Sequence, residues 1–347
     1  MTPPRWLRDP KVYLGLAVTI FFLWLSFRKV DLGLMWQSII HANPWLILIV
    51  VLQVFVMLFI RGHRWTLFLK PIVRMSWITL GWSTCIGFAV NNLLPARLGE
   101  VARSISASRK AKIGFSAVFG TVVVERIYDT LSLLVLFVCS LFVWEFSGPM
   151  TKLADAVQAE FGFQVSQESI ARNLGLLVAL ILAAVIALKW KTEFFLRLAG
   201  FFLKPLPVHW REKTINGLRN FISGLTQTRN PWEAAWIVIL SAILWIVSAI
   251  TVWIGLYACG IHAGITDAIF VLMSMAIAVS IPASPGYIGT YHFLTATAIT
   301  LALGSSWDQA MGAAIVIHLA NYLPQTLSGL IALAREGLSL KEIEERT

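Results

Sequence analysis

Residues 77–103 read WITLGWSTCIGFAVNNLLPARLGEVAR, an apolar run that is interrupted by two asparagines, a proline and a glycine. A second apolar run, residues 268–303, is interrupted by the segment IPASPGYIG at 281–289. Proline and glycine break a helix, and at membrane depth the freed backbone groups must be buried in protein or line a wet cavity. We therefore expect each run to form a broken helical hairpin.

The whole chain has the composition of an integral membrane protein. Of its 347 residues, 58% are hydrophobic and 13% are charged, and the mean hydropathy is +0.75. A soluble chain carries about a quarter charged residues, and a spanning helix needs about 20 mostly apolar residues. Besides the two interrupted runs, the candidate spans lie at about 12–27, 45–60, 115–143, 174–190, 235–259 and 310–333.

Charge and motif content exclude several classes of function. In a chain this apolar, the net charge of +10 belongs to residues at the edges of spans, so we expect no nucleic-acid partner. The three cysteines show no CxxC spacing, so we expect no disulfide framework, metal site or cofactor. The sequence lacks HExxH, GxSxG, P-loop and GxGxxG motifs, so we do not expect an enzyme.

The basic residues predict how the chain is oriented. Segments 61–75 and 96–114 carry four and five basic residues, whereas 260–267 has none. The positive-inside rule places the first two segments in the cytoplasm and the third outside. The 77–98 run must then enter and return on the same side, and the second interrupted run must do so from the opposite face. Both termini are expected to be cytoplasmic, in a bacterial inner membrane.

This order predicts an all-α polytopic protein, a single membrane domain over 1–347 with about six spans and two re-entrant hairpins in an inverted repeat. The first repeat covers 12–145 with its hairpin at about 76–112, and the second covers 174–333 with its hairpin at about 266–303. The segments Pro95–Gly99 and Pro282–Gly286 share the pattern P-A-x-x-G. Transporters often build midplane substrate sites from broken helices related in this way.

A further helix is expected over residues 205–231. Its apolar residues recur at spacings of three and four, with basic residues between them: Ile215, Leu218, Ile222 and Leu225. This pattern is typical of a basic amphipathic helix on the inner membrane surface. Packing on the inner mouth of a hairpin is an equal alternative. A short outer helix is predicted at 152–161.

Three charged residues, Glu125, Arg126 and Asp129, lie inside the apolar run 115–144. A charge at the centre of a bilayer costs about 2.5–3.5 kcal/mol on insertion scales. Glu125 and Asp129 are four residues apart and therefore share one helix face. Two interpretations remain open: a buried ion-pair network that holds helices together, and a wet polar site that faces the hairpins.

The first hairpin ends in arginines that suit a phosphate. Arg97 and Arg103 carry planar guanidinium groups that match phosphate oxygens. Glu100 is expected to hold one of them when the site is empty, and a helix that starts after Gly99 would favour an anion at its amide end. The alternative is that these arginines only satisfy the orientation rule.

The second hairpin demands an unusual backbone and carries polar side chains at membrane depth. Its turn residues are Pro282, Ser284, Pro285, Gly286 and Gly289, followed by Tyr291 and His292. His292 is a candidate phosphate donor or proton carrier, and equally a structural residue. His318 and Asn321 are weaker candidates, explained as well by contacts between helices.

Three motifs, Asn91–Arg103, Val122–Asp129 and Ile281–Gly289, resemble those of the lysylphosphatidylglycerol synthase transmembrane-domain family, also called flippase-like domain proteins. The resemblance implies a membrane fold that moves a modified lipid across the bilayer. The soluble aminoacyl transferase domain of some members is not recognised in this chain, so lysine transfer is not expected. His292 stands where similar members often carry a glutamate, which implies a different headgroup or proton coupling.

The residues that the resemblance implies are functional are Asn92, Pro95, Arg97, Gly99, Glu100, Arg103, Glu125, Arg126, Asp129, Pro282, Pro285, Gly286 and Gly289. From the residues themselves we add Ser284, Tyr291 and His292 as substrate-binding candidates.

The leading hypothesis is a flippase or transporter for an anionic lipid, either a phospholipid or a polyprenyl phosphate. Its headgroup would bind in a polar cleft between the hairpins. Arg97, Arg103 and Arg126 would bind phosphate, while acidic residues balance them. The alternatives are a membrane-embedded enzyme that modifies a lipid headgroup with the acidic residues, and a scaffold that recruits a lipid-synthesis partner through 205–231. Homo-oligomers are compatible with each.

Overall fold

A computed structural model of the chain consists of helices and the turns between them in the residues that it describes, which contain no strand. The prediction of an all-helical protein is therefore confirmed for that part of the chain. The described residues are 10–94, 98–143, 190–204, 207–225, 230–281 and 285–338, together with scattered helical positions between 169 and 187. The predicted outer helix at 152–161 lies outside them.

The helices up to residue 143 are α1 (Pro10–Phe27), α2 (Leu32–Ile40), α3 (Pro44–Leu69), α4 (Trp77–Leu93), α5 (Gly99–Ala111) and α6 (Phe115–Val143). Those that follow are α9 (Thr192–Phe202), α10 (Val208–Leu225), α11 (Pro231–Ala258), α12 (Ile265–Ala278), the short 3-10 turn η3 (Pro285–Tyr287), α13 (Thr290–Leu303) and α14 (Trp307–Glu336).

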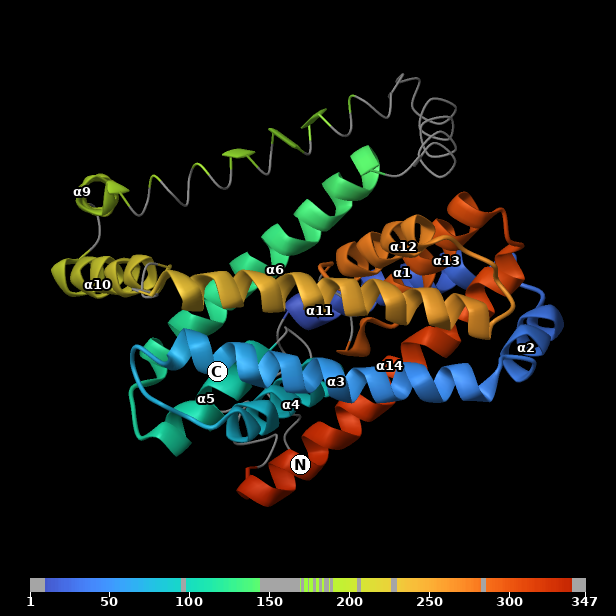
Figure 1. The fold of residues 1–347 in the computed structure, drawn as a ribbon, viewed down its shortest axis with the longest axis horizontal. Coiled ribbons are helices and arrows are strands. Elements are labelled where there is room, and N and C mark those ends of the chain that lie inside the picture. Colours follow the sequence, from blue (N-terminus) through green and yellow to red (C-terminus); the bar gives the residue numbers. More distant parts are fainter. Residues whose placement is uncertain are drawn as a thin grey trace.

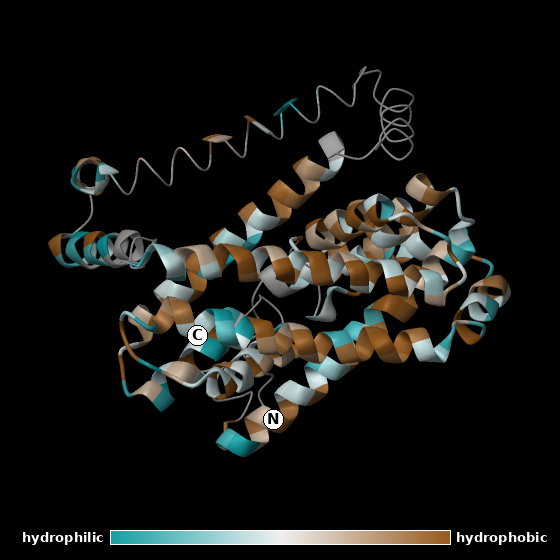
Figure 2. Cartoon of the chain, in the orientation of Figure 1, coloured by the Kyte–Doolittle hydropathy of each residue, from teal (hydrophilic) through white to brown (hydrophobic). Residues whose placement is uncertain are grey.

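The longest apolar helices, α3 and α11, run antiparallel and lie side by side (Figure 1). At one end the Asn43 amide donates to the Ala258 carbonyl (2.7 Å), and at the other Lys70 pairs with Glu233. At 26 and 28 residues, and 1.5 Å per residue, they are about 39 and 42 Å long, more than the roughly 30 Å of a hydrocarbon core. Hydrophobic residues cover most of both (Figure 2).

Of the described helices, α3 and α11 are long and apolar enough by length and composition to cross a membrane. They contain the predicted spans 45–60 and 235–259. The predicted spans 12–27, 115–143 and 310–333 are also helical. Residues 174–190 are only partly described. That all six segments cross a membrane stays a prediction.

Both α3 and α11 begin with the same local sequence, Asn-Pro-Trp at 43–45 and 230–232. The asparagine side chain caps the first amides of the helix, and the proline occupies the first helical position, where its missing N–H costs nothing. The two copies are 187 residues apart, the same separation as the two P-A-x-x-G segments.

The first interrupted run folds as two antiparallel helices, α4 and α5. The hydroxyls of Ser83 and Ser106 are 2.7 Å apart, and the Gly99 amide donates to Asn91 Oδ1 (2.7 Å). A Cβ on Gly99 would lie 2.1 Å from the Gly87 carbonyl oxygen, so this close approach requires glycine. Residues 95–97 lie outside the described part of the chain.

The second interrupted run forms α12 and α13, joined by a segment that contains η3. Gly286 and Gly289 adopt positive φ angles of 70° and 92°, which a side chain would strain. The Ser274 hydroxyl donates to the Leu294 carbonyl (2.8 Å) and ties the two helices together. Residues 282–284 are among those not described.

Helix packing in the two halves follows the same pattern. Helix α3 contacts α4 and α6, and α11 contacts α12 and α14. Likewise α5 packs on α6 while α13 packs on α14, and α4 packs on α14 while α12 packs on α6. The predicted amphipathic segment 205–231 contains α10, which contacts α6 and α9. The result is a bundle in which the two interrupted runs meet between the long helices.

A single glycine allows α14 to approach α4. A Cβ on Gly329 would lie 2.2 Å from the Cys85 carbonyl oxygen and 2.3 Å from the Ala89 Cβ. We expect Gly329→Ala to lower the unfolding temperature of the purified protein in detergent, because overpacking of this kind costs about 1–3 kcal/mol. Gly120→Ala in α6 is the matched control, since its Cβ would meet no described atom within 4 Å. Equal unfolding temperatures for the two variants would contradict this packing.

Candidate functional site

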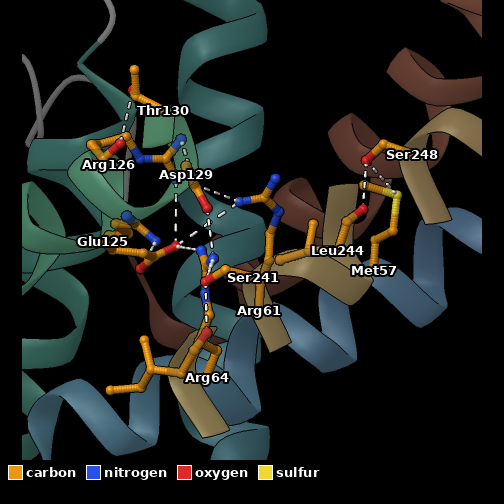
Figure 3. Close-up of polar contacts among 12 residues, drawn as sticks. Met57, Arg61, Arg64, Glu125, Arg126, Asp129, Thr130, Ser241, Leu244 and Ser248 are labelled. Atoms are coloured by element: carbon orange, nitrogen blue, oxygen red, sulfur yellow. Dashed lines mark hydrogen bonds and ion pairs between the residues drawn. The ribbon is translucent and has the colours of Figure 1, made fainter. Parts of the chain in front are cut away.

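The inner part of the bundle holds a cluster of charged side chains from α3, α5 and α6 (Figure 3). Helix α6 supplies Glu125, Arg126 and Asp129, as the sequence indicates. Helix α3 supplies Arg61 and Arg64, which the charge count assigned to a cytoplasmic segment at 61–75. Both arginines are buried side chains of α3, which continues to Leu69, while the cytoplasmic location of the segment stays a prediction.

Each carboxylate in the cluster is shared by several arginines. Arg64 binds both, with Nη1 2.6 Å from Asp129 Oδ1 and Nη2 3.0 Å from Glu125 Oε1. Arg103 Nη1 lies 3.1 Å from Glu125 Oε2, and Arg61 Nη1 lies 3.3 Å from Asp129 Oδ2. Arg126 approaches both carboxylates at 3.5 Å. Each carboxylate thus bridges helices that are distant in the sequence.

The arginines make further contacts with a neighbouring helix and with two aromatic rings. Arg64 Nη1 also donates to the Ser241 hydroxyl of α11 (2.8 Å), which places α11 against the cluster. The Arg103 guanidinium lies 4.8 Å from the centroid of the Trp65 ring, and that of Arg61 lies 5.6 Å from Phe88. Such cation–π contacts stabilise guanidinium groups that are withdrawn from water.

The cluster has more positive than negative charge. Four guanidinium groups, from Arg61, Arg64, Arg103 and Arg126, face the carboxylates of Glu125 and Asp129 and the neighbouring Glu100, which leaves an excess of one positive charge. The side chains of Arg64 and Glu125 are 0% exposed, whereas that of Arg126 is 41% exposed. Buried Arg103 Nη2 and Arg126 Nε have no hydrogen-bond partner among the described residues. An anion would supply both the missing charge and the missing acceptors.

A cavity of about 670 Å³ adjoins this cluster and extends between the two interrupted runs. One wall, which we call the charged wall, contains Arg61, Arg103, Arg126 and Asp129, with Glu100 beside them. The other wall, which we call the neutral wall, comes from η3, α13 and α14. Its polar residues are Tyr287, Tyr291, His318, Asn321, Tyr322 and Gln325. No Asp, Glu, Lys or Arg occurs among the described residues of the neutral wall.

Helices α6 and α14 present equivalent faces to the cavity. Arg126, Asp129, Thr130 and Leu133 of α6 line it at spacings of three, four and seven residues. His318, Asn321, Tyr322 and Gln325 of α14 line it at the same spacings. These spacings place each set on one side of its helix. The lining residues of the two helices therefore have the same spacing, but those of α6 include charged side chains and those of α14 do not.

Most of the predicted site residues come together here. Seven of them line the cavity: Asn92, Gly99, Glu100, Arg103, Arg126, Asp129 and Tyr291. Glu125 lies behind it, fully buried among arginines. Glu100 Oε2 accepts from Asn91 Nδ2 (3.4 Å), and no ion pair of Glu100 with an arginine occurs among the described residues. Arg97, Ser284, Pro95 and Pro282 lie outside the described part of the chain.

The remaining predicted residues shape the turn rather than the cavity surface. His292 Nδ1 lies 3.4 Å from the Gly289 amide, and its Nε2 lies 3.3 Å from His318 Nδ1. A Cβ on Gly286, next to Pro285, would meet the Tyr322 ring at 2.8 Å. In this arrangement His318 lines the cavity and His292 contacts it from behind, and a direct role of His292 in binding a ligand stays a prediction.

Arg61, Arg64 and Trp245 were not predicted from the sequence. The two arginines had a detectable signal, because they lie three residues apart, directly after an apolar run, in a chain whose buried Glu125 and Asp129 need cationic partners. Trp245 had none, since a tryptophan in an apolar helix is usually in contact with lipid or core.

Removal of a carboxylate from the cluster tests its structural role. Glu125→Gln leaves Arg103 buried without its carboxylate partner and removes one of the two partners of Arg64, and breaking a buried pair typically costs about 3–5 kcal/mol. We expect a large drop in the unfolding temperature of the detergent-purified protein. Arg126→Gln should lower it far less, because Arg126 is partly exposed and leaves each carboxylate with other arginines. Equal stability of the two variants would show that the Glu125 pairs do not hold the helices together.

Comparison with known proteins places this architecture in a family. The family model for the lysylphosphatidylglycerol synthase TM region matches residues 12–329. The chain is also 24% identical over 342 residues to a UPF0104 membrane protein of Pyrococcus horikoshii, and the match covers 94% of this chain and 97% of that protein. These matches confirm the family indicated by the three sequence motifs. The chain therefore belongs to the lysylphosphatidylglycerol synthase transmembrane-region family and is a membrane protein.

Proposed function

We propose that the protein is a flippase or transporter that moves an anionic lipid across a bacterial cytoplasmic membrane. The observation that carries this proposal is the excess of positive charge on a cavity between the two interrupted runs. A cavity in this position suits a headgroup, and unpartnered guanidinium nitrogens suit phosphate oxygens. Membership of a lipid-related membrane family supports the same class of ligand.

The proposed architecture is an inverted repeat with two re-entrant hairpins. Three observations support it. The Asn-Pro-Trp and P-A-x-x-G segments recur at one separation, and the helix contacts of one half have counterparts in the other. In addition, α5, α12 and α13, at 13, 14 and 14 residues, are about 20 Å long and too short to cross a bilayer.

The hairpins enter from opposite ends of the α3–α11 pair. Helix α4 begins close after the Lys70 end of α3, and α12 begins close after the Ala258 end of α11. With the basic 61–75 segment in the cytoplasm, the first hairpin enters from the inside and the second from the outside. Both chain termini are then cytoplasmic.

In the proposed mechanism, the phosphate binds to the charged wall while the acyl chains remain in the bilayer. Arg61, Arg103 and Arg126 contact the phosphate. Glu125 and Asp129 hold the arginines in place and balance part of their charge when the cavity is empty. Exposed lining residues, including Thr130 and Ile277, mark the side through which the chains extend. Access alternates as one repeat rocks against the other.

The contacts of the acidic residues favour this proposal over an enzyme that acts on the headgroup. Such an enzyme needs a carboxylate that is free to transfer a proton or to hold a metal. Glu125 and Asp129 are instead bound by several guanidinium groups each, which leaves Glu100 as the lining carboxylate on which the enzyme alternative depends. For the scaffold alternative, the relevant surface is α10, whose described contacts are with α6 and α9.

The test is lipid movement in proteoliposomes. The purified protein is reconstituted with fluorescent phospholipids or with polyprenyl phosphate, and loss of signal from the outer leaflet is followed after addition of a membrane-impermeant quencher. We expect movement of anionic lipid to be fast with the wild type and at least about tenfold slower with Arg126→Ala, because charge-assisted hydrogen bonds contribute about 1.5–3 kcal/mol.

Arg74→Ala is the matched control, since Arg74 is an exposed arginine outside the cluster. It should move lipid at the wild-type rate. Absence of lipid movement for every lipid, with or without a proton gradient, would overturn the proposed function. An equal rate of lipid movement for wild type and Arg126→Ala would show that the charged wall is not part of the transport path.

A further inference from the structure

Two histidines are in contact where the second interrupted run meets α14. His292 of α13 and His318 of α14 are both buried, and His292 Nε2 lies 3.3 Å from His318 Nδ1. The Gly289 amide donates to His292 Nδ1 (3.4 Å). This nitrogen therefore carries no proton, so His292 Nε2 is the donor and His318 Nδ1 is the acceptor. The hydrogen-bond network thus assigns both imidazoles as neutral rings.

This chain of hydrogen bonds has no place for an additional proton. A proton on His318 Nδ1 would set two N–H donors against each other, and a proton on His292 Nδ1 would do the same with the Gly289 amide. Either addition replaces an attractive contact by a repulsive one and leaves a buried charge. Proton binding is therefore favoured only in an arrangement in which these groups have moved apart.

The segment that the two rings hold has an unusual backbone. Gly286, Tyr287 and Gly289 adopt positive φ angles of 70°, 56° and 92°. A positive φ is uncommon for a residue with a side chain, such as Tyr287, and persists only where the surrounding structure imposes it. Here the surrounding contacts include the Gly289 amide on His292 and the interaction of the Gly286 backbone with the His318 ring.

The same segment connects the two interrupted runs. A Cβ on Gly286 would lie 2.8 Å from the Tyr322 ring and 3.5 Å from the Asn92 carbonyl oxygen, so the turn lies against the end of α4. The Tyr322 hydroxyl donates to that carbonyl (3.1 Å), and Asn92 Nδ2 donates to Thr326 Oγ1 of α14 (2.8 Å). A movement of the turn is therefore transmitted to both α4 and α14.

The groups around the histidine pair are neutral. Thr19 and Leu23 of α1 lie against Gly289. Tyr291 stacks on His318 with the ring centroids 4.3 Å apart, and the Tyr322 ring lies at 5.4 Å from it. Among the described residues, no Asp, Glu, Lys or Arg acts electrostatically on either imidazole. The charged side chains that line the same cavity belong to the charged wall: Arg61, Glu100, Arg103, Arg126 and Asp129.

We propose that the His292–His318 pair is a proton-binding site that acts as a switch: one proton bound to the pair separates the two rings and releases the turn at 285–289 from α14. The proton reaches the pair through the cavity, which His318 lines. Uptake occurs on acidification below about pH 6.5, where imidazole in water becomes charged. The inference goes beyond the proposed function, because the switch is the same in a transporter, an enzyme or a scaffold.

Solid-state nuclear magnetic resonance of the full chain in lipid bilayers, with ¹⁵N-labelled histidine rings, tests the site. Ring nitrogen shifts distinguish the neutral tautomers from imidazolium, and single His292→Gln and His318→Gln variants assign the signals. At about pH 8 we expect both rings as neutral Nε2–H tautomers. At about pH 5 we expect those two signals to be replaced by that of an imidazolium on one ring of the pair.

Hydrogen–deuterium exchange of the same protein measures the release of the turn. After correction for the chemical effect of pH, the amides of 285–293 should exchange at least about tenfold faster at low pH, the factor that corresponds to the loss of one hydrogen bond. The amides in the middle of α11 should keep their exchange rate. The double variant His292→Gln/His318→Gln has no titratable ring at the pair and should show no pH dependence in the turn.

The double variant His41→Gln/His63→Gln is the matched control, since both of these histidines are exposed. It should keep the wild-type response. An imidazolium in the pair at about pH 8, neutral rings throughout at about pH 5, or a turn whose exchange does not depend on pH would each overturn the inference. These three readouts use wild type alone, so they remain decisive if a variant fails to fold. None of them measures lipid movement, so a failure of the proposed function is distinguishable from a failure of the switch.

Discussion

Glu125 and Arg64 are both fully buried, and the rest of the structure depends on their contact at 3.0 Å. A carboxylate withdrawn from water is stable only when cationic partners and hydrogen bonds compensate for its lost hydration. Glu125 meets that requirement with arginines from α3 and α5, so these two helices must converge on α6. The cluster therefore fixes the bundle and also produces the charged wall of the cavity.

The excess of arginines indicates that the cluster is a binding site and not only a network that holds helices together. A network that served only to hold helices together would be most stable with equal numbers of opposite charges. Here one positive charge remains, Arg126 is partly exposed, and buried guanidinium nitrogens of Arg103 and Arg126 lack acceptors among the described residues. This unbalanced part of the cluster is where the proposed anionic headgroup would bind.

The sequence predicts the fold class and part of the site. The physical reason is different for the helix interruptions and for the charged residues. Pro95 and Gly99, like Pro285 and Gly286, act locally on the backbone, so helix interruptions can be recognised without tertiary information. Glu125 and Asp129 stand out because charge is costly in an apolar run. Arg61 and Arg64 were missed as members of the cluster because counting basic residues cannot distinguish a loop arginine from one buried in the last turns of a helix. Trp245 depends on which side of α11 faces the cavity, which only the packed structure reveals.

A cryo-electron microscopy structure of the protein in nanodiscs of anionic lipid tests most directly whether the charged wall of the cavity binds a lipid phosphate. We expect phosphate density in the cavity, within hydrogen-bonding distance of Arg103 and Arg126, and acyl chains that extend from it into the bilayer. A well-resolved map in which the cavity contains only water, and in which lipid phosphates occur only at the outer surface of the helices, would contradict it.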